Sequence, residues 1–202
     1  MKTVRIYGMA HNLTKSPPAP KGQGVWLSNS PGSYERRLPR ALGEWTRWFN
    51  LHSRAHMLKA YPKGFNYYKT VSDGRPIYFQ KIQPDVPASV VFPRERIQEA
   101  FKLPDGSPNR FFSCTICWLI AFAILEGFER IELWGFALRD NKANPGQCFA
   151  YERPGFFYWV QQARNRGIEV IYQKEIEKLP FKPGDPTTYT GPLYGYETKP
   201  EE

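Results

Sequence analysis

The sequence predicts an α/β protein: a single three-layer Rossmann-like domain with a mainly parallel central sheet and an irregular C-terminal tail. Three observations support this prediction. Short apolar segments rich in Val, Ile and aromatic residues alternate with longer apolar or amphipathic segments, which is the pattern of strands joined by crossover helices. Glycine or proline bounds many of these segments. The chain of 202 residues is 41% hydrophobic and 16% aromatic, which is enough for one substantial core.

The first half of the chain contains three expected strands. Apolar residues form short runs that stop at turn-forming residues, first at Gly8 and then at the Ser28–Gly32 cluster. A short helix follows the third strand, and Pro62 and Gly64 are expected to end it. The expected elements are strands at 4–7, 25–27 and 45–51 and a helix at 55–60.

The second half alternates more regularly between strands and helices. One helix begins at Pro93, because proline is tolerated in the first turn of a helix, and another ends at Gly167. The expected elements are strands at 76–82, 130–136 and 168–172 and helices at 93–102, 113–128 and 154–167. The domain is expected to span residues 1–180, followed by a Pro-, Gly- and Tyr-rich tail, 181–202. Tyr189, Tyr194 and Tyr196 of the tail are expected to pack back onto the domain, and packing onto a partner subunit is the alternative.

Composition and charge limit the function classes. The formal net charge is +9, from 28 Lys and Arg against 19 Asp and Glu, so an anionic partner is expected, either a nucleotide-type small molecule or nucleic acid. The basic residues are dispersed, which argues against a nonspecific nucleic-acid tail. Three cysteines are too few for a secreted disulfide framework, and the longest apolar run, 114–125, is shorter than the roughly 20 residues of a membrane span. We therefore expect a cytoplasmic protein that does not enter a membrane.

Residues that directly follow strands are the candidate ligand contacts, because ligands of open parallel sheets bind beyond the carboxyl ends of the strands. After the first strand, Gly8 and Ala10 leave room for a phosphate or ribose to approach the backbone, and Asn12 can form a hydrogen bond with it. The third glycine of the dinucleotide-binding fingerprint is missing, so an ordinary turn explains this loop as well. After the second strand, Asn29 can recognise a base or sugar, and a β-turn is again the alternative.

A third cluster opens the long apolar helix. With Ser113 as the N-cap, the free N–H groups of the first turn are expected to bind a phosphate or carboxylate near Cys114 and Thr115. Cys114 and Cys117 also have the spacing of metal or redox pairs. A zinc site needs about four ligands, and no second Cys or His pair stands at zinc spacing. We therefore expect buried cysteines and no metal site.

Gly135 is expected to let its strand end beside a bound phosphate or sugar, and the segment after it contains further polar residues. The phenol of Tyr151 and the guanidinium of Arg153 suit a phosphate, and a solvent-exposed loop is the alternative. Asp140 and Glu152 fall in the same segment and are expected to lie at the end of a central strand.

Two histidines, His52 and His56, stand four residues apart, the spacing of a metal pair or a base on a helix. The metalloprotease pattern HExxH is absent. We expect His52, at the end of a strand, to be the acid–base candidate and His56 to lie on the surface.

The segment FFSCTICWLIAFAILEGFERIELWGFALRD, which begins at Phe111, resembles bacterial lipooligosaccharide sialyltransferases and the related pterin diphosphokinase-like Rossmann domains. The chain resembles a set of uncharacterised phage and prophage proteins more closely still. The segments that carry this resemblance are WFNLH at 48–52, FAYERPG at 149–155, RNRGIEVIY at 164–172 and PLYGYE at 192–197. The resemblance covers most of the chain and implies a Rossmann-like nucleotide-binding fold.

The resemblance also implies a ligand and its contacts. In the sialyltransferases the loop after the first strand, an Asn after the second strand and the Ser cluster hold a cytidine nucleotide sugar. Tyrosines of a later loop contact the leaving phosphate, and Tyr151 matches them. A bound nucleotide or nucleotide sugar is therefore expected, without a metal. The residues that match the nucleotide contacts are Gly8, Ala10, Asn12, Asn29, Ser113, Cys114 and Thr115.

The sequence departs from the sialyltransferases at catalytic positions. Their strand-end aspartate is absent, because the sequence reads Gly135-Phe136-Ala137, and Cys114 stands where serine is usual. Their general-base histidine is absent from the matching region, 151–160. The remaining base candidates are His52, Asp140 and Glu152.

Three functional hypotheses follow. The leading one is a phage-type glycosyltransferase-like enzyme that transfers a group from a nucleotide sugar to a hydroxyl acceptor, with modified phage DNA as one acceptor that would suit the charge. The second is a non-catalytic nucleotide binder or sequestering protein, which the missing aspartate and histidine favour. The third is a structural or DNA-associated phage accessory protein in which the fold serves only as a scaffold.

Overall fold

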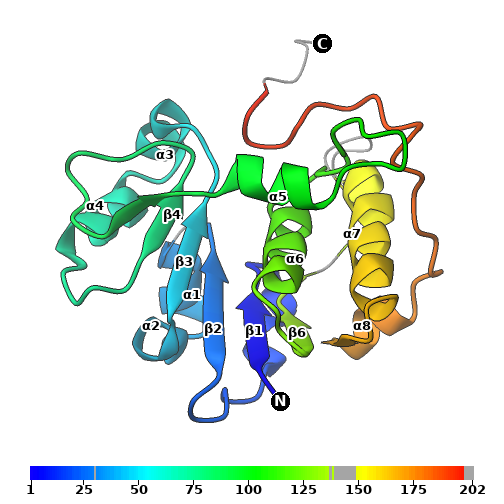
Figure 1. Cartoon of the computed structure of the whole chain (residues 1–202). Coiled ribbons are helices and arrows are strands. Elements are labelled where there is room, and N and C mark those ends of the chain that lie inside the picture. Colours follow the sequence, from blue (N-terminus) through cyan, green and yellow to red (C-terminus); the bar gives the residue numbers. More distant parts are fainter. Residues whose placement is uncertain (30, 137, 139–148, 198–202) are drawn as a thin grey trace. The chain divides into compact units, whose positions relative to one another are not determined.

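The computed structural model describes residues 1–29, 31–136, 138 and 149–197, without the side chains of residues 11, 12 and 149–151. The expected fold class is confirmed: the protein has a Rossmann-like α/β fold, and its strands run parallel in one seven-stranded sheet of order β5-β4-β3-β2-β1-β6-β7 (Figure 1). The strands are β1 (Thr3–Tyr7), β2 (Gly24–Ser28), β3 (Arg47–Asn50), β4 (Ile77–Phe79), β5 (Ser89–Val91), β6 (Arg130–Trp134) and β7 (Glu169–Tyr172).

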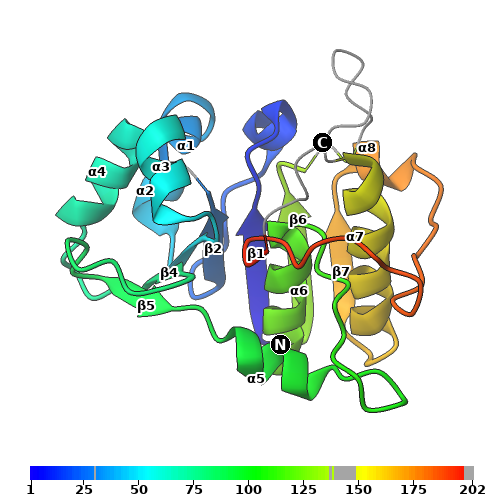
Figure 2. The same ribbon diagram turned by 90° about the horizontal axis from the view of Figure 1, so that it is seen from above.

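The chain divides into two compact units. The N-terminal unit consists of Val4–Phe92 and Trp134–Phe136. Helices α1 to α4 of this unit lie together beside strands β2 and β4, and the helices of the unit contact one another (Figure 2). They are the 3-10 helix η1 (His11–Lys15) and the α-helices α1 (Pro31–Arg37), α2 (Ala41–Glu44), α3 (Arg54–Ala60) and α4 (Pro62–Thr70).

Aromatic side chains form the core of the N-terminal unit. Trp48 of β3 is fully buried, and its ring meets those of Tyr34, Trp45 and Tyr68 edge to face, with centroids 5.6, 5.3 and 5.5 Å away. Edge-to-face pairs contribute about 0.5–1.5 kcal/mol each beyond the area that they bury. This core fixes helices α1 and α4 against the sheet.

The C-terminal unit consists of Met1–Thr3, Pro93–Leu133 and Ala137–Glu202. Its helices are α5 (Arg94–Ala100), α6 (Thr115–Leu125), α7 (Phe149–Arg164) and α8 (Lys174–Glu177). Helix α6 is buried from its first residue to Ala123 and lies beside α7, as both views show (Figures 1 and 2). Phe112 stacks between Trp118 of α6 and Trp159 of α7, with ring centroids 3.6 and 4.7 Å away.

The tail runs over the C-terminal unit without regular secondary structure as far as Glu197. Leu193 is buried, the Tyr194 amide donates to the Phe112 carbonyl at 3.0 Å, and the Trp118 indole donates to the Tyr194 carbonyl at 3.1 Å. The ring of Tyr196 meets Trp118 edge to face at 5.7 Å. The expectation that the tail tyrosines pack back onto the domain is confirmed for these residues.

Several elements differ from the sequence-based expectation. Helices α1 and α4 and strand β5 were not expected. The two helices were missed because Pro31 and Pro62 were interpreted as residues that end an element, although each is the first residue of a helix. Helix α7 begins at Phe149 instead of Pro154, which lies inside it. The expectation of a loop at 149–153 was therefore wrong.

Candidate functional site

The carboxyl ends of β1 and β2 are joined by one buried phenol. The Tyr34 hydroxyl lies 2.8 Å from the carbonyl oxygens of both Tyr7 and Ser28 and accepts from the Ser28 amide at 3.0 Å. The Ser28 hydroxyl also donates to Tyr7, at 3.0 Å. Complete burial raises the pKa of Tyr34 and keeps it a neutral donor. These bonds hold the two strand ends where a ligand of a parallel sheet would bind.

The loop after β1 is packed against the end of β6. The amides of Gly8 and Ala10 donate to the carbonyls of Trp134 and Gly135, at 2.8 and 2.7 Å. A Cβ at Gly8 would lie 2.5 Å from the Gly135 oxygen and 2.6 Å from the Phe136 ring, and Gly135 has φ +77°. Close contacts within the protein therefore explain why glycine stands at positions 8 and 135.

Asn29 follows β2 in a left-handed conformation with φ 59°. Its carbonyl accepts from the Trp48 indole at 2.7 Å and from the Tyr68 hydroxyl at 2.5 Å. Its side-chain oxygen Oδ1 is buried, and the described residues offer it no hydrogen-bond partner. A buried acceptor of this kind suits an N–H or O–H group of a ligand.

His52 follows β3 and stacks on His56 of α3, with ring centroids 4.6 Å apart. The Ser53 side chain caps α3 by accepting from the His56 amide at 3.2 Å, which fixes the helix start. Burial, and then the charge of His56, lower the pKa of His52 from 6.5 to about 4. His52 is therefore uncharged at neutral pH and only a weak general base there.

Hydrogen bonds link two of the predicted residues of this unit, Asn29 and His52. Tyr68 donates to the Asn29 carbonyl and accepts from the Asn50 amide group at 3.2 Å, and the Asn50 side-chain oxygen accepts from the His52 amide at 3.3 Å. Sequence reasoning missed Asn50 and Tyr68. The sequence did contain a signal for Asn50, because an asparagine at the end of an apolar strand is expected to be buried and then needs polar partners for its amide.

The start of α6 differs by one residue from the expectation. Cys114, not Ser113, is the N-cap, with φ −160° and ψ 168°, and its side chain makes no capping hydrogen bond. Thr115 is the first helical residue and is 6% exposed. Its hydroxyl Oγ1 is buried and has no partner among the described residues. An uncapped first turn therefore stands beside an unsatisfied buried hydroxyl.

The cysteines of α6 are buried, as predicted: Cys114 is 5% exposed and Cys117 is fully buried. Their Sγ atoms are 3.4 Å apart, and the Ser113 hydroxyl lies 3.7 Å from Cys117 Sγ. Gly155 of α7 packs directly on this turn, since an added Cβ would lie 2.3 Å from the Ser113 hydroxyl.

The polar residues expected in a loop lie in the first turns of α7. The Arg153 guanidinium donates twice to the Leu138 carbonyl, from Nε at 2.9 Å and from Nη2 at 2.7 Å. Glu152 acts electrostatically on Cys114, so it belongs to the surroundings of the α6 start. Asp140 and the side chains of Tyr151 and Asn12 lie outside the described residues.

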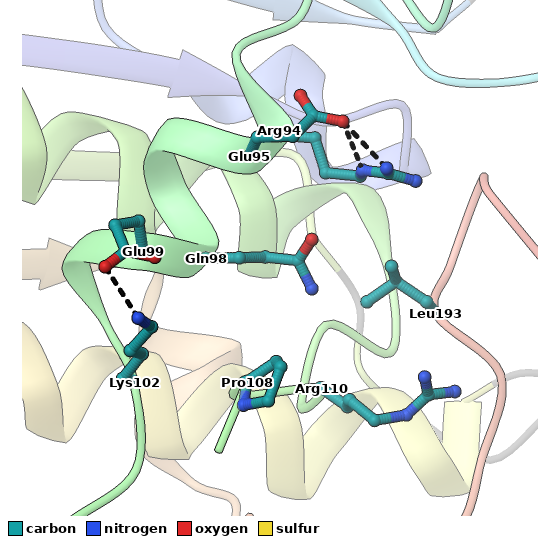
Figure 3. A pocket seen from close by; sticks show the side chains of 8 residues that line it. All are labelled: Arg94, Glu95, Gln98, Glu99, Lys102, Pro108, Arg110 and Leu193. Carbon is teal, nitrogen blue, oxygen red and sulfur yellow. Dashed lines mark hydrogen bonds and ion pairs between the residues drawn. The ribbon is translucent and has the colours of Figure 1, made fainter. Parts of the chain in front are cut away.

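A pocket of about 400 Å³ opens elsewhere on the C-terminal unit, between α5 and the tail (Figure 3). Its three cations pair with nearby carboxylates: Arg94 with Glu95 at 2.7 Å, Lys102 with Glu99 at 2.6 Å and Arg110 with Glu197 at 2.7 Å. None of the predicted site residues lines it. The lining residues are Arg94, Glu95, Gln98, Glu99, Lys102, Pro108, Arg110 and Leu193.

Within the described ranges, no three His, Cys, Asp or Glu side chains are grouped so that they could hold a metal ion. Within the same ranges, every helix is too short or too polar to span a membrane. Comparison of the chain with protein-family models, with curated proteins and with solved structures finds no match.

Proposed function

We propose that the protein binds a phosphate-bearing ligand of the nucleotide type, with the phosphate at the first turn of α6. The observation that supports this proposal most directly concerns the Thr115 hydroxyl, which is buried and has no hydrogen-bond partner among the described residues. Such a group costs about 1–3 kcal/mol when it remains unsatisfied. A bound phosphate oxygen would satisfy it.

The backbone of the same turn supports an anionic ligand. The Cys114 side chain makes no capping bond to the first N–H groups of α6, and the Cys117 amide donates to the Cys114 carbonyl at 3.1 Å. The N–H groups at the start of a helix and the positive end of the helix dipole together favour a phosphate. The net charge of +9 favours the approach of anions to the protein.

The finer proposal is group transfer from a nucleotide sugar to a hydroxyl acceptor. Of the three base candidates, His52 has too low a pKa for an efficient base at neutral pH, whereas Glu152 belongs to the surroundings of the α6 start. Glu152 would take the acceptor proton, and the helix N–H groups would stabilise the departing phosphate. A binder that leaves its ligand intact is the alternative.

The test is a thermal-shift panel of nucleotides and nucleotide sugars on the wild type and Thr115→Val. Valine keeps the shape of threonine and removes the unsatisfied hydroxyl, so the free variant should melt at or above the wild-type temperature. A ligand that binds only the folded state raises the wild-type melting temperature. Thr115→Val should lose most of this shift, while Thr70→Val, at an exposed position of α4, should keep it.

Recovery of each ligand separates the two versions of the proposal. Donor breakdown that stops in Glu152→Gln while the thermal shift remains supports transfer, and an intact ligand supports a binder. If no ligand stabilises the wild type, or if Thr115→Val shifts as much as the wild type, phosphate binding at α6 is wrong. A structural or DNA-associated role is then the better explanation.

A further inference from the structure

The two cysteines at the start of α6 are placed as a pair. Cys114 is the N-cap, and Cys117 is the third helical residue, so both side chains belong to the first turn. Their Sγ atoms are 3.4 Å apart, and both thiols are free. A disulfide needs an S–S distance of about 2.05 Å, which side-chain rotation across a gap of about 1.4 Å would supply.

The surroundings of the pair favour a bond within the turn over a bond between chains. Cys117 is fully buried and Cys114 is 5% exposed, so a second protein chain cannot reach Cys117. Among the described residues, the Ser113 hydroxyl lies 3.7 Å from Cys117 Sγ, and the Glu152 carboxylate of α7 and the Tyr189 phenol of the tail interact electrostatically with the pair.

We propose that Cys114 and Cys117 are a redox pair that a small-molecule disulfide, such as oxidised glutathione, converts reversibly into an intramolecular disulfide. This inference is independent of the proposed ligand. The sequence offered the CxxC spacing alone, and the sulfur–sulfur distance within an uncapped first turn is what distinguishes the pair from two core cysteines.

The reaction proceeds in two exchange steps. The Cys114 thiolate attacks one sulfur of oxidised glutathione, forms a mixed disulfide and releases one glutathione thiolate. The Cys117 thiolate then attacks Cys114 Sγ, forms the internal bond and releases the second glutathione. The two protons of the cysteine thiols end on the two glutathione molecules, and the protein loses two electrons to the oxidant.

The rate should be slow near neutral pH. Burial raises the pKa of the Cys114 thiol, with further contributions from Cys117 and the negative charge of Glu152, and only the thiolate attacks. Below that pKa, the thiolate fraction grows about tenfold per pH unit, so the exchange rate should rise with pH.

The experiment uses the full chain with Cys148→Ser, so that only the pair can react. The protein is equilibrated in glutathione buffers of graded ratio, both folded and in urea, and from the reduced and the oxidised side. Samples are then unfolded, alkylated and weighed by mass spectrometry. We expect the oxidation equilibrium constant to be at least about tenfold larger in the folded protein, a difference of roughly 30 mV in reduction potential.

Matched variants check the order of the steps. In the same background, Cys117→Ser should stop at the glutathione mixed disulfide on Cys114, and Cys114→Ser should remain unmodified while folded. By linkage, the oxidised protein should also unfold at a higher urea concentration than the reduced one. Equal equilibrium constants in the folded and unfolded chains, or an oxidised chain that cannot refold, would overturn the proposal.

Discussion

His52 shows how burial changes the chemistry of a single residue. Its position at the end of β3 was predicted, and its spacing from His56 suggested acid–base work. The structure encloses the ring between His56 and Tyr61, with the Tyr61 centroid 6.1 Å away. Burial lowers the pKa of His52 to about 4, so the same enclosure that positions the ring weakens it as a base.

The stability of the protein should therefore depend on pH between 6.5 and 4. In the unfolded chain His52 takes up a proton near pH 6.5, whereas folded His52 does so only near pH 4. Protons thus favour the unfolded state as the pH falls through this window, and the stability present above pH 6.5 is progressively lost. From pH 7.5 to pH 5 the loss should be about 1–2 kcal/mol. Urea unfolding at both pH values measures it.

His52→Gln should flatten this dependence, because glutamine cannot titrate. His56→Gln is the control. It removes the charge of His56, the smaller cause of the lowered His52 pKa, and leaves the burial of His52, so most of the pH dependence of stability should remain. Equal losses of stability in wild type and His52→Gln would contradict the assignment.

Single residues differed in how far the sequence could predict them. Asn29 and His52 were found because each follows an apolar strand, where the backbone rule for parallel sheets applies. Asn50 and Tyr68, which connect them, were missed because their partners come from other elements and only the folded chain brings these together. Thr115 was predicted as a ligand contact, but its lack of a partner depends on packing and could not be predicted.

At the scale of elements, the contact between α6 and α7 depends on Gly155. An added Cβ would meet the Ser113 hydroxyl at 2.3 Å and Cys117 Sγ at 3.3 Å, so no side chain fits between the helices at this point. Close approach of the two helices keeps the first turn of α6 in place. The absence of a side chain at Gly155 is therefore structural, although the residue follows a proline and looks like a turn in the sequence.

Gly155→Ala should destabilise the protein by about 1–3 kcal/mol through overpacking. Ser113→Ala removes the nearest atom, so the double variant should recover part of the loss, with a coupling energy above about 1 kcal/mol. Urea unfolding of the four proteins gives this cycle. Gly32→Ala is the matched control, since Gly32 lies in α1 with nothing near its Cβ position, and alanine should be neutral or stabilising there. Independent, additive effects at 113 and 155 would refute the tight contact.

The elements that the sequence missed were missed for two physical reasons. A proline begins each of the helices α1 and α4. Local sequence rules interpret proline first as a residue that ends an element, so these two helices were not predicted. Strand β5 has only three residues, two of them exposed, so it lacks the apolar pattern of a central strand. The long apolar helix α6 and the strands β1, β2 and β6 were recovered because their burial is nearly continuous along the chain.

At the scale of the whole molecule, the tail completes the core of the C-terminal unit. Leu193 is 4% exposed, and the ring of Tyr189 packs on Phe111 with centroids 4.8 Å apart. The Glu197 carboxylate accepts from the Arg110 guanidinium at 2.7 Å and from the Leu193 amide at 2.9 Å. The tail thus covers the segment that leads into α6.

Truncation after Thr188 should destabilise the C-terminal unit by at least about 3 kcal/mol, because it uncovers Phe111 and Trp118 and removes the burial of Leu193. Urea unfolding followed by tryptophan fluorescence measures the change, and the exposed indole should shift the native emission to longer wavelength. A truncated protein with wild-type midpoint and emission would show that the tail contributes no stability.

The docking of the tail has a consequence for synthesis on the ribosome. The N-terminal unit is almost contiguous, from Val4 to Phe92, so most of its contacts can form while later residues are still being translated. The C-terminal unit joins Met1–Thr3 to Pro93–Leu133 and to the tail. Its apolar helix α6 therefore emerges about 70 residues before Leu193 and Tyr194 can cover it, and during that interval its apolar surface is open to a chaperone.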